Sequence, residues 1–192
     1  GGASHDFDRW FKNEDLATLG EPPRMYTRDY SDRPNDLIAP GSSIRMLTLC
    51  TNQPLPEQVR ETVFAIAKGG GGLFAMHAAC WRNWEDWEAY YDLIGGAATG
   101  HEPLQEFRVE VLVPNHPVTQ GMPASFTIVD ELYRFEPQGE IYVLAEGVSL
   151  KTGERYPVVW IPETFRVVGT TLGHDGQAHE HAAFKTLLRN AT

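Results

Sequence analysis

The sequence has few of the features that would place a chain directly in a familiar class. Its 16 basic residues against 26 acidic ones give a net charge of −10. That balance argues against non-specific binding to nucleic acid or to an anionic membrane, because phosphate contacts need a basic face. No apolar run approaches the ~20 residues of a membrane helix, and no stretch has the pattern of a signal peptide. Two cysteines cannot make a disulfide framework. They fit either a reducing compartment or an exported protein with few cysteines.

Local catalytic motifs are absent as well. A serine elbow needs the pattern G-x-S-x-G, which the sequence does not contain. The zinc-binding spacings H-E-x-x-H and C-x-x-C are also missing. A catalytic or metal site would therefore have to be assembled from residues that are far apart in the sequence.

What is present suits one globular domain over residues 1–192. Hydrophobic residues make up 42% of the chain and charged residues 22%. In the first half, apolar runs alternate with segments of helical pattern, as in 57–68, where Val59, Val63 and Ala67 share one face. Helices are predicted at 8–19, 57–68 and 85–94, and strands at 24–27, 44–50 and 71–76. This alternation predicts an α/β fold with a mainly parallel sheet.

The second half has a different pattern, with short strands separated by turns and few helices. Strands are predicted at 107–113, 125–130, 141–146, 156–161 and 165–172, followed by a final helix at 177–191. We expect some of these strands to form antiparallel hairpins added to the sheet.

The chain starts with "GGASHD", which has the character of a loop that follows a strand. Glycines at this place suit the tight turn that leaves a strand. We therefore expect roughly five to eight apolar residues before Gly1, forming a first strand beside the one predicted at 44–50.

Polar side chains follow many of the predicted strands. Ligands of open α/β sheets bind at the carboxyl ends of the strands, so we expect these side chains to share one rim. The candidates are His5, Asp6, His77, His101, Asp130, Glu131, Tyr133, His174 and Asp175. By contrast, His116 lies in a turn, and His179 and His181 are predicted to face solvent in the final helix.

The segment "GGLFAMHAACWRNWEDW" places His77 where a strand turns into a helix, the position of a catalytic elbow. Histidine there suits acid–base work or metal ligation better than nucleophilic attack. Cys80 lies one turn further on and is expected to be a buried, unreactive thiol. A divalent metal such as zinc would need three or four ligands, which His77, His101, His174 and Glu131 could supply if the fold gathers them.

Three tryptophans follow this elbow, and each has two interpretations. Core packing is expected for Trp87. Trp81 and Trp84 lie nearer the strand end, where an aromatic face could stack on a sugar ring, although simple packing is the more common use of such residues.

Several segments together resemble the trehalose-utilisation (ThuA-like) family: "GGASHDF", "CTNQP", "GGGGLFAMHAACWRNWEDW", "YYDLIGGAATGHE", "NHPVTQGMP", "VDELYRF", "YPVVW" and "TLGHDGQAHEHAAF". The resemblance covers nearly the whole chain in the same order. It implies a flavodoxin-like, three-layer fold similar to class I glutamine amidotransferases. In those enzymes a cysteine occupies the elbow, and here His77 stands in its place, so glutamine amidotransferase activity is not expected. The family is associated with bacterial catabolism of disaccharides and 3-keto sugars.

We therefore expect a carbohydrate-active enzyme, a hydrolase, lyase or isomerase, in the bacterial cytoplasm or periplasm. Glu131 or His77 would act as general base, and His174 or His101 would polarise a carbonyl or protonate a leaving group. The expected catalytic residues are His77, Glu131, His174, His101 and His5, and the expected substrate-binding residues are Asp6, Trp81, Trp84, Asp130, Tyr133 and Asp175.

Two alternatives remain at this point. One is a non-catalytic sugar-binding or sensing module, and the other is a metal-dependent hydrolase of another small molecule. The expected partner is a small sugar, with no nucleic acid and no membrane, and a homo-oligomer is compatible with the sequence.

Overall fold

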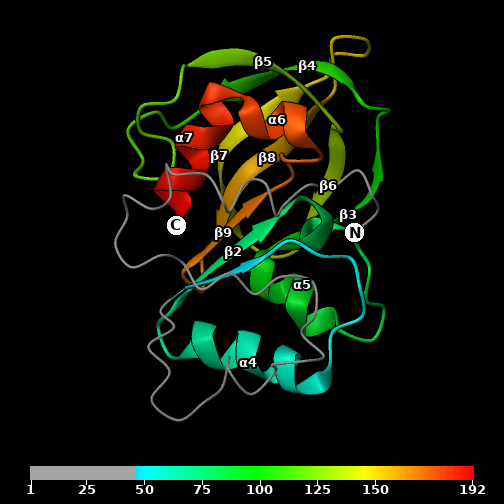
Figure 1. Ribbon diagram of the computed structural model, residues 1–192, viewed down its shortest axis with the longest axis vertical. Helices are drawn as coiled ribbons and strands as arrows, with labels where there is room; N and C mark the ends of the chain where they lie inside the picture. The colour runs from blue at the N-terminus through cyan, green and yellow to red at the C-terminus, as the bar shows by residue number, and fades with distance from the viewer. Residues whose placement is uncertain (1–45) are drawn as a thin grey trace.

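The structure is a computed structural model that describes residues 46–192 (Figure 1). The elements predicted at 8–19 and 24–27, the side chains of His5 and Asp6, and the strand expected before Gly1 lie outside the described residues. Within the described part of the chain, the predicted α/β class is confirmed.

The main sheet has seven strands in the order β1-β2-β9-β8-β7-β4-β5. The strands are β1 (Met46–Leu49), β2 (Gly72–Met76), β4 (Gln105–Val111), β5 (Ser125–Asp130), β7 (Ile141–Val148), β8 (Arg155–Pro162) and β9 (Val167–Thr170). β1, β2 and β9 run parallel, and the four strands from β8 to β5 are joined by antiparallel pairings. The sheet is therefore mixed, with a parallel part from the first half and β9, and added antiparallel strands from the second half.

Helices cover both faces of the parallel strands (Figure 1). On one face lie α4 (Glu57–Lys68) and α5 (Glu88–Ile94), and on the other lie α6 (Gly176–Glu180) and α7 (Ala182–Ala191). The side chains of β2 alternate between the two faces, as the period of a strand requires. Leu73 and Ala75 belong to the core beneath α4 and α5, whereas Phe74 and Met76 belong to the core beneath α6 and α7. The result is the expected three-layer arrangement.

The structure also contains a second, two-stranded sheet, which the sequence pattern does not predict. It consists of β3 (Gly96–His101) and β6 (Tyr133–Pro137), which pair antiparallel. The "GGAATG" segment has the pattern of a loop, because glycine and alanine have low strand propensity. This small sheet matters for the site because it carries His101 at one end of β3 and Tyr133 at the start of β6.

The final helix predicted at 177–191 is in fact two helices. The helix is interrupted at His181, which has extended dihedral angles of φ −67° and ψ 128°. The His181 side chain accepts a hydrogen bond from the Ala183 N–H at the start of α7. His179 is buried with 3% exposure, and its Nε2 donates to the Gly173 carbonyl at 3.0 Å. The expectation that His179 faces solvent is therefore wrong, because the turn before α6 folds back onto it.

The other predicted elements occur with small changes at their ends. The helix predicted at 85–94 begins three residues later as α5, and β1 and β2 fall within the predicted strands. α4 has the predicted limits, and its buried residues include Val59, Val63 and Ala67. Among residues 46–192, no helix is both long and apolar enough to span a bilayer.

Candidate active site

His77 lies immediately after β2, at the carboxyl end of the parallel strands, and starts a short 3₁₀ helix, η1 (His77–Cys80). Its backbone has φ 45°, in the left-handed region, and it is the one non-glycine residue of the described chain with a positive φ. Non-glycine residues in this region are held by their surroundings and occur often at functional sites. The predicted elbow is therefore present, with an imidazole at its apex.

The imidazole of His77 is completely buried and is fixed at both ring nitrogens. Nδ1 lies 2.7 Å from the carbonyl oxygen of Thr171, which follows β9. A carbonyl can only accept, so Nδ1 carries the proton, and in the neutral ring Nε2 is left as an acceptor. Nε2 lies 3.1 Å from the Tyr133 hydroxyl and 3.2 Å from Nδ1 of His174.

Glu131 joins these side chains into one cluster. Its Oε2 lies 3.0 Å from His174 Nδ1 and 3.5 Å from His77 Nε2, and its Oε1 lies 3.7 Å from His101 Nδ1. The Glu131 and His174 side chains are 16% and 15% exposed, and that of His101 is 37% exposed. Three histidines predicted to lie on one rim thus meet at one partly exposed carboxylate.

Asp130 does not face this opening, contrary to our expectation that it binds substrate. It is the last residue of β5 and is completely buried. Its carboxylate accepts hydrogen bonds from the backbone N–H groups of Gly173, His174 and Glu131 at 2.7, 3.1 and 2.8 Å. Burial raises the pKa of Asp130, against the effects of the His77 ring and these N–H donors. Asp130 therefore holds together the two segments that carry Glu131 and His174.

Aromatic rings form one side of the cluster. The Trp81 ring meets the Tyr133 and His101 rings edge to face, with centroids 5.2 and 5.5 Å apart. Trp81 is half-buried and its backbone bridges to Ala98 of β3. Tyr133 and His101 are paired across β6 and β3. The small sheet therefore brings this aromatic wall against the carboxyl end of β2.

Two other predicted substrate contacts have structural roles. Trp84 is 4% exposed and packs in the core beside Trp87 and Tyr90, with its indole N–H donating to the Gln53 carbonyl. Asp175 is the N-cap of α6 and accepts from the N–H groups of Gln177 and Ala178. Burial in the core rules out a substrate contact for Trp84, so that expectation is corrected. Asp175 is partly exposed, and its binding of substrate stays a prediction. Trp87 lies in the core as predicted.

Cys80 is completely buried, and its thiol lies 3.3 Å from the Thr170 carbonyl and 3.5 Å from that of Ala75. Burial raises the pKa of Cys80 well above the usual range of a thiol. Burial also raises the pKa of Cys50. Since only a thiolate is a good nucleophile, the expectation of a buried and unreactive Cys80 agrees with its surroundings.

The surroundings shift the pKa values of the Glu131 carboxyl and the Tyr133 hydroxyl in opposite directions. Burial raises the pKa of Glu131, but the neighbouring imidazoles of His77, His174 and His101 lower it overall. Burial, followed by the charge of Glu131, raises the pKa of Tyr133 far above its usual range. The cluster therefore combines an ionised carboxylate with a phenol that keeps its proton near neutral pH.

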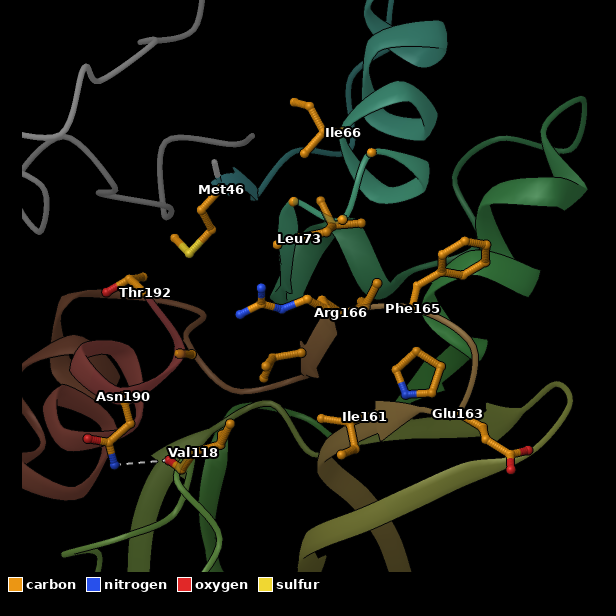
Figure 2. Close-up of a pocket in the computed structure, with 18 of the residues that line it drawn as sticks. Met46, Ile66, Leu73, Val118, Ile161, Glu163, Phe165, Arg166, Asn190 and Thr192 are labelled. Carbon is orange, nitrogen blue, oxygen red and sulfur yellow. Dashed lines mark hydrogen bonds between the residues drawn. The ribbon is translucent and has the colours of Figure 1, made fainter. Parts of the chain in front are cut away.

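A large pocket of the described structure lies elsewhere. It has a volume of about 1090 Å³ and lies at the amino ends of the parallel strands, where it is lined by Met46, Leu73 and Val167 (Figure 2). Phe165 and Arg166 also line it. Its volume would suit a small ligand, but His77 and Thr171 follow the opposite ends of β2 and β9. We place the candidate site at the histidine–carboxylate cluster, because the acid–base groups meet there.

Sequence reasoning missed one participant, the backbone carbonyl of Thr171. It fixes the tautomer of His77, yet a carbonyl has no side-chain signal in a sequence. The available hint was the segment "TTLGHD", in which the predicted strand ends just before His174.

Comparison with known proteins agrees with this architecture. A family model named ThuA and described as trehalose utilisation matches residues 38–192. No curated protein matches the chain.

Among solved structures, a ThuA-like protein from Bacteroides uniformis is 24% identical with a TM-score of 0.65, covering 77% of this chain and 67% of its own. A ThuA-like protein from Parabacteroides merdae is 22% identical with a TM-score of 0.68, over 77% and 68%. A protein from Salmonella typhimurium, described as cytoplasmic, is 12% identical with a TM-score of 0.62, over 94% and 83%. At such identities the likeness shows the fold, which is consistent with the flavodoxin-like class, and not the activity.

Proposed function

This chain belongs to the ThuA family of trehalose utilisation, and from that premise we propose that it is an enzyme of bacterial carbohydrate catabolism. It acts on a glycoside or a keto-sugar by acid–base chemistry at Glu131 and its neighbouring histidines. The observation that carries this proposal is the sharing of one carboxylate by His77, His101 and His174, beside the hydroxyl of Tyr133.

Glu131 is the residue that we assign as general base. Its pKa is lowered, because the interactions with the histidines outweigh the effect of burial, so it is ionised at neutral pH. It is partly exposed, whereas the His77 ring is fully buried. A base must reach the proton that it removes, and this favours Glu131 over His77 as the group that meets the substrate.

Tyr133 and His174 are the proton donors of the proposed mechanism. The phenol of Tyr133 stays protonated because of burial and the nearby carboxylate, so its O–H, on turning away from His77 Nε2, donates to a carbonyl or glycosidic oxygen of the substrate. His174 lies 3.0 Å from Glu131 and is partly exposed, a position from which it could pass a proton to a leaving group. Trp81 offers the apolar face on which the C–H bonds of a sugar ring stack.

The thiol chemistry of glutamine amidotransferases has no counterpart in this proposal. Cys80 is buried and hydrogen-bonded to backbone carbonyls, and the elbow carries His77 in place of a nucleophile. A sugar-binding module without catalysis is the alternative that the experiment must separate.

The test is turnover of a panel of disaccharides and their 3-keto derivatives, followed by product analysis, with sugar binding measured by calorimetry. Glu131→Gln and Tyr133→Phe should lower turnover by roughly 10²–10⁴-fold, the usual contribution of a positioned acid or base. His116→Ala, at the opposite end of the strands, is the control. Sugar binding without turnover in the wild type would favour the binding module. Turnover that survives Glu131→Gln unchanged would overturn the assignment of the base.

A further inference from the structure

Three atoms of the kinds that bind divalent transition metals meet at the site. They are His77 Nε2, His174 Nδ1 and Glu131 Oε2, and they lie within 4.8 Å of one another. The separate distances are 3.2 Å between the two imidazole nitrogens, and 3.5 and 3.0 Å from these to the carboxylate oxygen.

These separations suit a single metal ion. With metal–ligand bonds of about 2.0–2.1 Å, octahedral or tetrahedral angles place neighbouring ligand atoms roughly 2.8–3.4 Å apart. The three distances lie within or close to that range without movement of the backbone. His101, whose Nδ1 also donates to the carbonyl oxygen of Glu102 at 2.8 Å, is outside the set of three ligand atoms.

The surroundings hold the His77 ring as metal-ligating histidines are commonly held. Histidine ligands usually donate their second N–H to a carbonyl or carboxylate, which fixes the ring and its tautomer. His77 does so through Nδ1 to the Thr171 carbonyl, which leaves Nε2 unprotonated, 3.1 Å from the Tyr133 hydroxyl, 3.2 Å from His174 Nδ1 and 3.5 Å from Glu131 Oε2. The Asp130 carboxylate accepts hydrogen bonds from the backbone N–H groups of Glu131 and His174 and so fixes the backbone of both residues. A donor set of two histidines and one carboxylate binds Zn²⁺ or Fe²⁺ in preference to Mg²⁺ or Ca²⁺.

We propose that His77, His174 and Glu131 bind one divalent first-row transition-metal ion, with Zn²⁺ favoured, and leave its remaining positions to water and a substrate oxygen. This inference rests on the proposed function in that the ion serves the same site. With the ion bound, His77, His174 and Glu131 act as its ligands, which replaces the acid–base roles given above to Glu131 and His174, while Tyr133 and His101 remain as the protic groups beside the substrate.

The experiment measures metal binding to the full chain without any sugar. Protein freed of metal with a chelator is titrated with Zn²⁺ and with Co²⁺ by calorimetry, and the Co²⁺ form is followed by its visible absorption. We expect one ion per chain. Glu131→Gln and His174→Ala should weaken binding by at least about 100-fold, since even loss of an outer hydrogen bond costs 10–100-fold. His116→Ala is the control and should bind like the wild type. Circular dichroism of each variant, and the metal-dependent rise of its melting temperature, show that the fold is kept.

The outcomes separate the two proposals. Absence of stoichiometric binding in the wild type, or equal affinity in the Glu131→Gln and His174→Ala variants, would overturn the metal site. If no ion binds and sugar turnover persists undiminished in chelator-treated protein, the enzyme assignment stands and the metal inference fails. If one ion binds at these three residues but no sugar of the panel is turned over, the metal site stands and the proposed substrate class fails.

Discussion

Replacing Gly169 by alanine should strongly destabilise the protein through a single clash with Trp160. The two residues are direct partners across β9 and β8. A Cβ at position 169 would lie 2.2 and 2.3 Å from two carbons of the Trp160 ring and 2.7 Å from its nitrogen, where ordinary contacts are 3.4–4 Å. The indole would have to move by about 1 Å, because the backbone of a central strand cannot move away.

The ring has little room for that movement. Trp160 is completely buried, its ring centroid lies 3.8 Å from that of Phe135, and its N–H donates to the Ile94 carbonyl at 2.7 Å. Overpacking of a dense core costs roughly 1–3 kcal/mol, and loss of the buried hydrogen bond adds about 1 kcal/mol. Alanine recovers roughly 0.5–1 kcal/mol by restricting the unfolded chain. The net loss in the free energy of unfolding is therefore about 1–3.5 kcal/mol.

Urea unfolding of the wild type, Gly169→Ala and Gly100→Ala measures this difference. Gly100 also lies in a strand, but the nearest atom to a Cβ there is 3.7 Å away on the flexible Arg134 side chain. We expect the midpoint to fall sharply for Gly169→Ala and to stay near that of the wild type for Gly100→Ala, with similar slopes. A Gly169→Ala variant within about 0.5 kcal/mol of the wild type, the range of neutral surface changes, would show that Trp160 is not packed as described.

Two other predictions concern buried groups near the site. Cys80→Ala should cost about 1 kcal/mol of stability through lost packing and leave the rate of turnover unchanged. A thiol reagent should label wild-type Cys80 only as fast as the protein unfolds. Rapid labelling of the folded protein with loss of activity would contradict this. Burial lowers the pKa of His179 in the folded protein. Below pH about 6.5 the unfolded chain therefore binds a proton at His179 more readily than the folded chain does, and the free energy of unfolding should fall as the pH drops. His179→Gln should lose less stability over that range, and parallel pH profiles of the two proteins from urea unfolding would refute the assignment.

The parallel part of the fold was predictable because burial on both faces leaves a strong sequence signal. β1 and β2 are apolar runs, and α4 has a clear apolar face. β3 carries no such signal. At Gly96, a Cβ would lie 2.3 Å from the Glu136 carbonyl oxygen and 2.7 Å from the Phe135 ring. Close approach to β6 thus requires glycine at a strand position, and a segment of small residues that looks like a loop is ordered by tertiary contact.

The sequence predicts which residues lie near the site, but it does not predict which of them face a ligand and which bind the backbone. His77, Glu131 and His174 were placed by the rule that ligands gather where strands of such sheets end, and they do meet. The same rule selected Asp130 and Asp175, which serve backbone N–H groups. A carboxylate near a strand end can face a ligand or accept from backbone N–H groups, and only its hydrogen-bond partners in the folded chain distinguish the two. Asp130 and Glu131 are neighbours in sequence, yet they face opposite ways because successive side chains of an extended chain alternate.

The backbone of His77 departs from the usual preference of non-glycine residues for negative φ, and its contacts in the site explain why. A left-handed backbone favours glycine, and a histidine there costs roughly 1–2 kcal/mol. Glycine at this position would relieve the strain but would remove the ring that connects the Thr171 carbonyl with Glu131, His174 and Tyr133. The backbone turn directs the imidazole toward β9 and the β5–β6 junction rather than along the strand. The strain is thus offset by contacts that no other side chain at the end of β2 could make, and it is best explained as a cost of placing this imidazole.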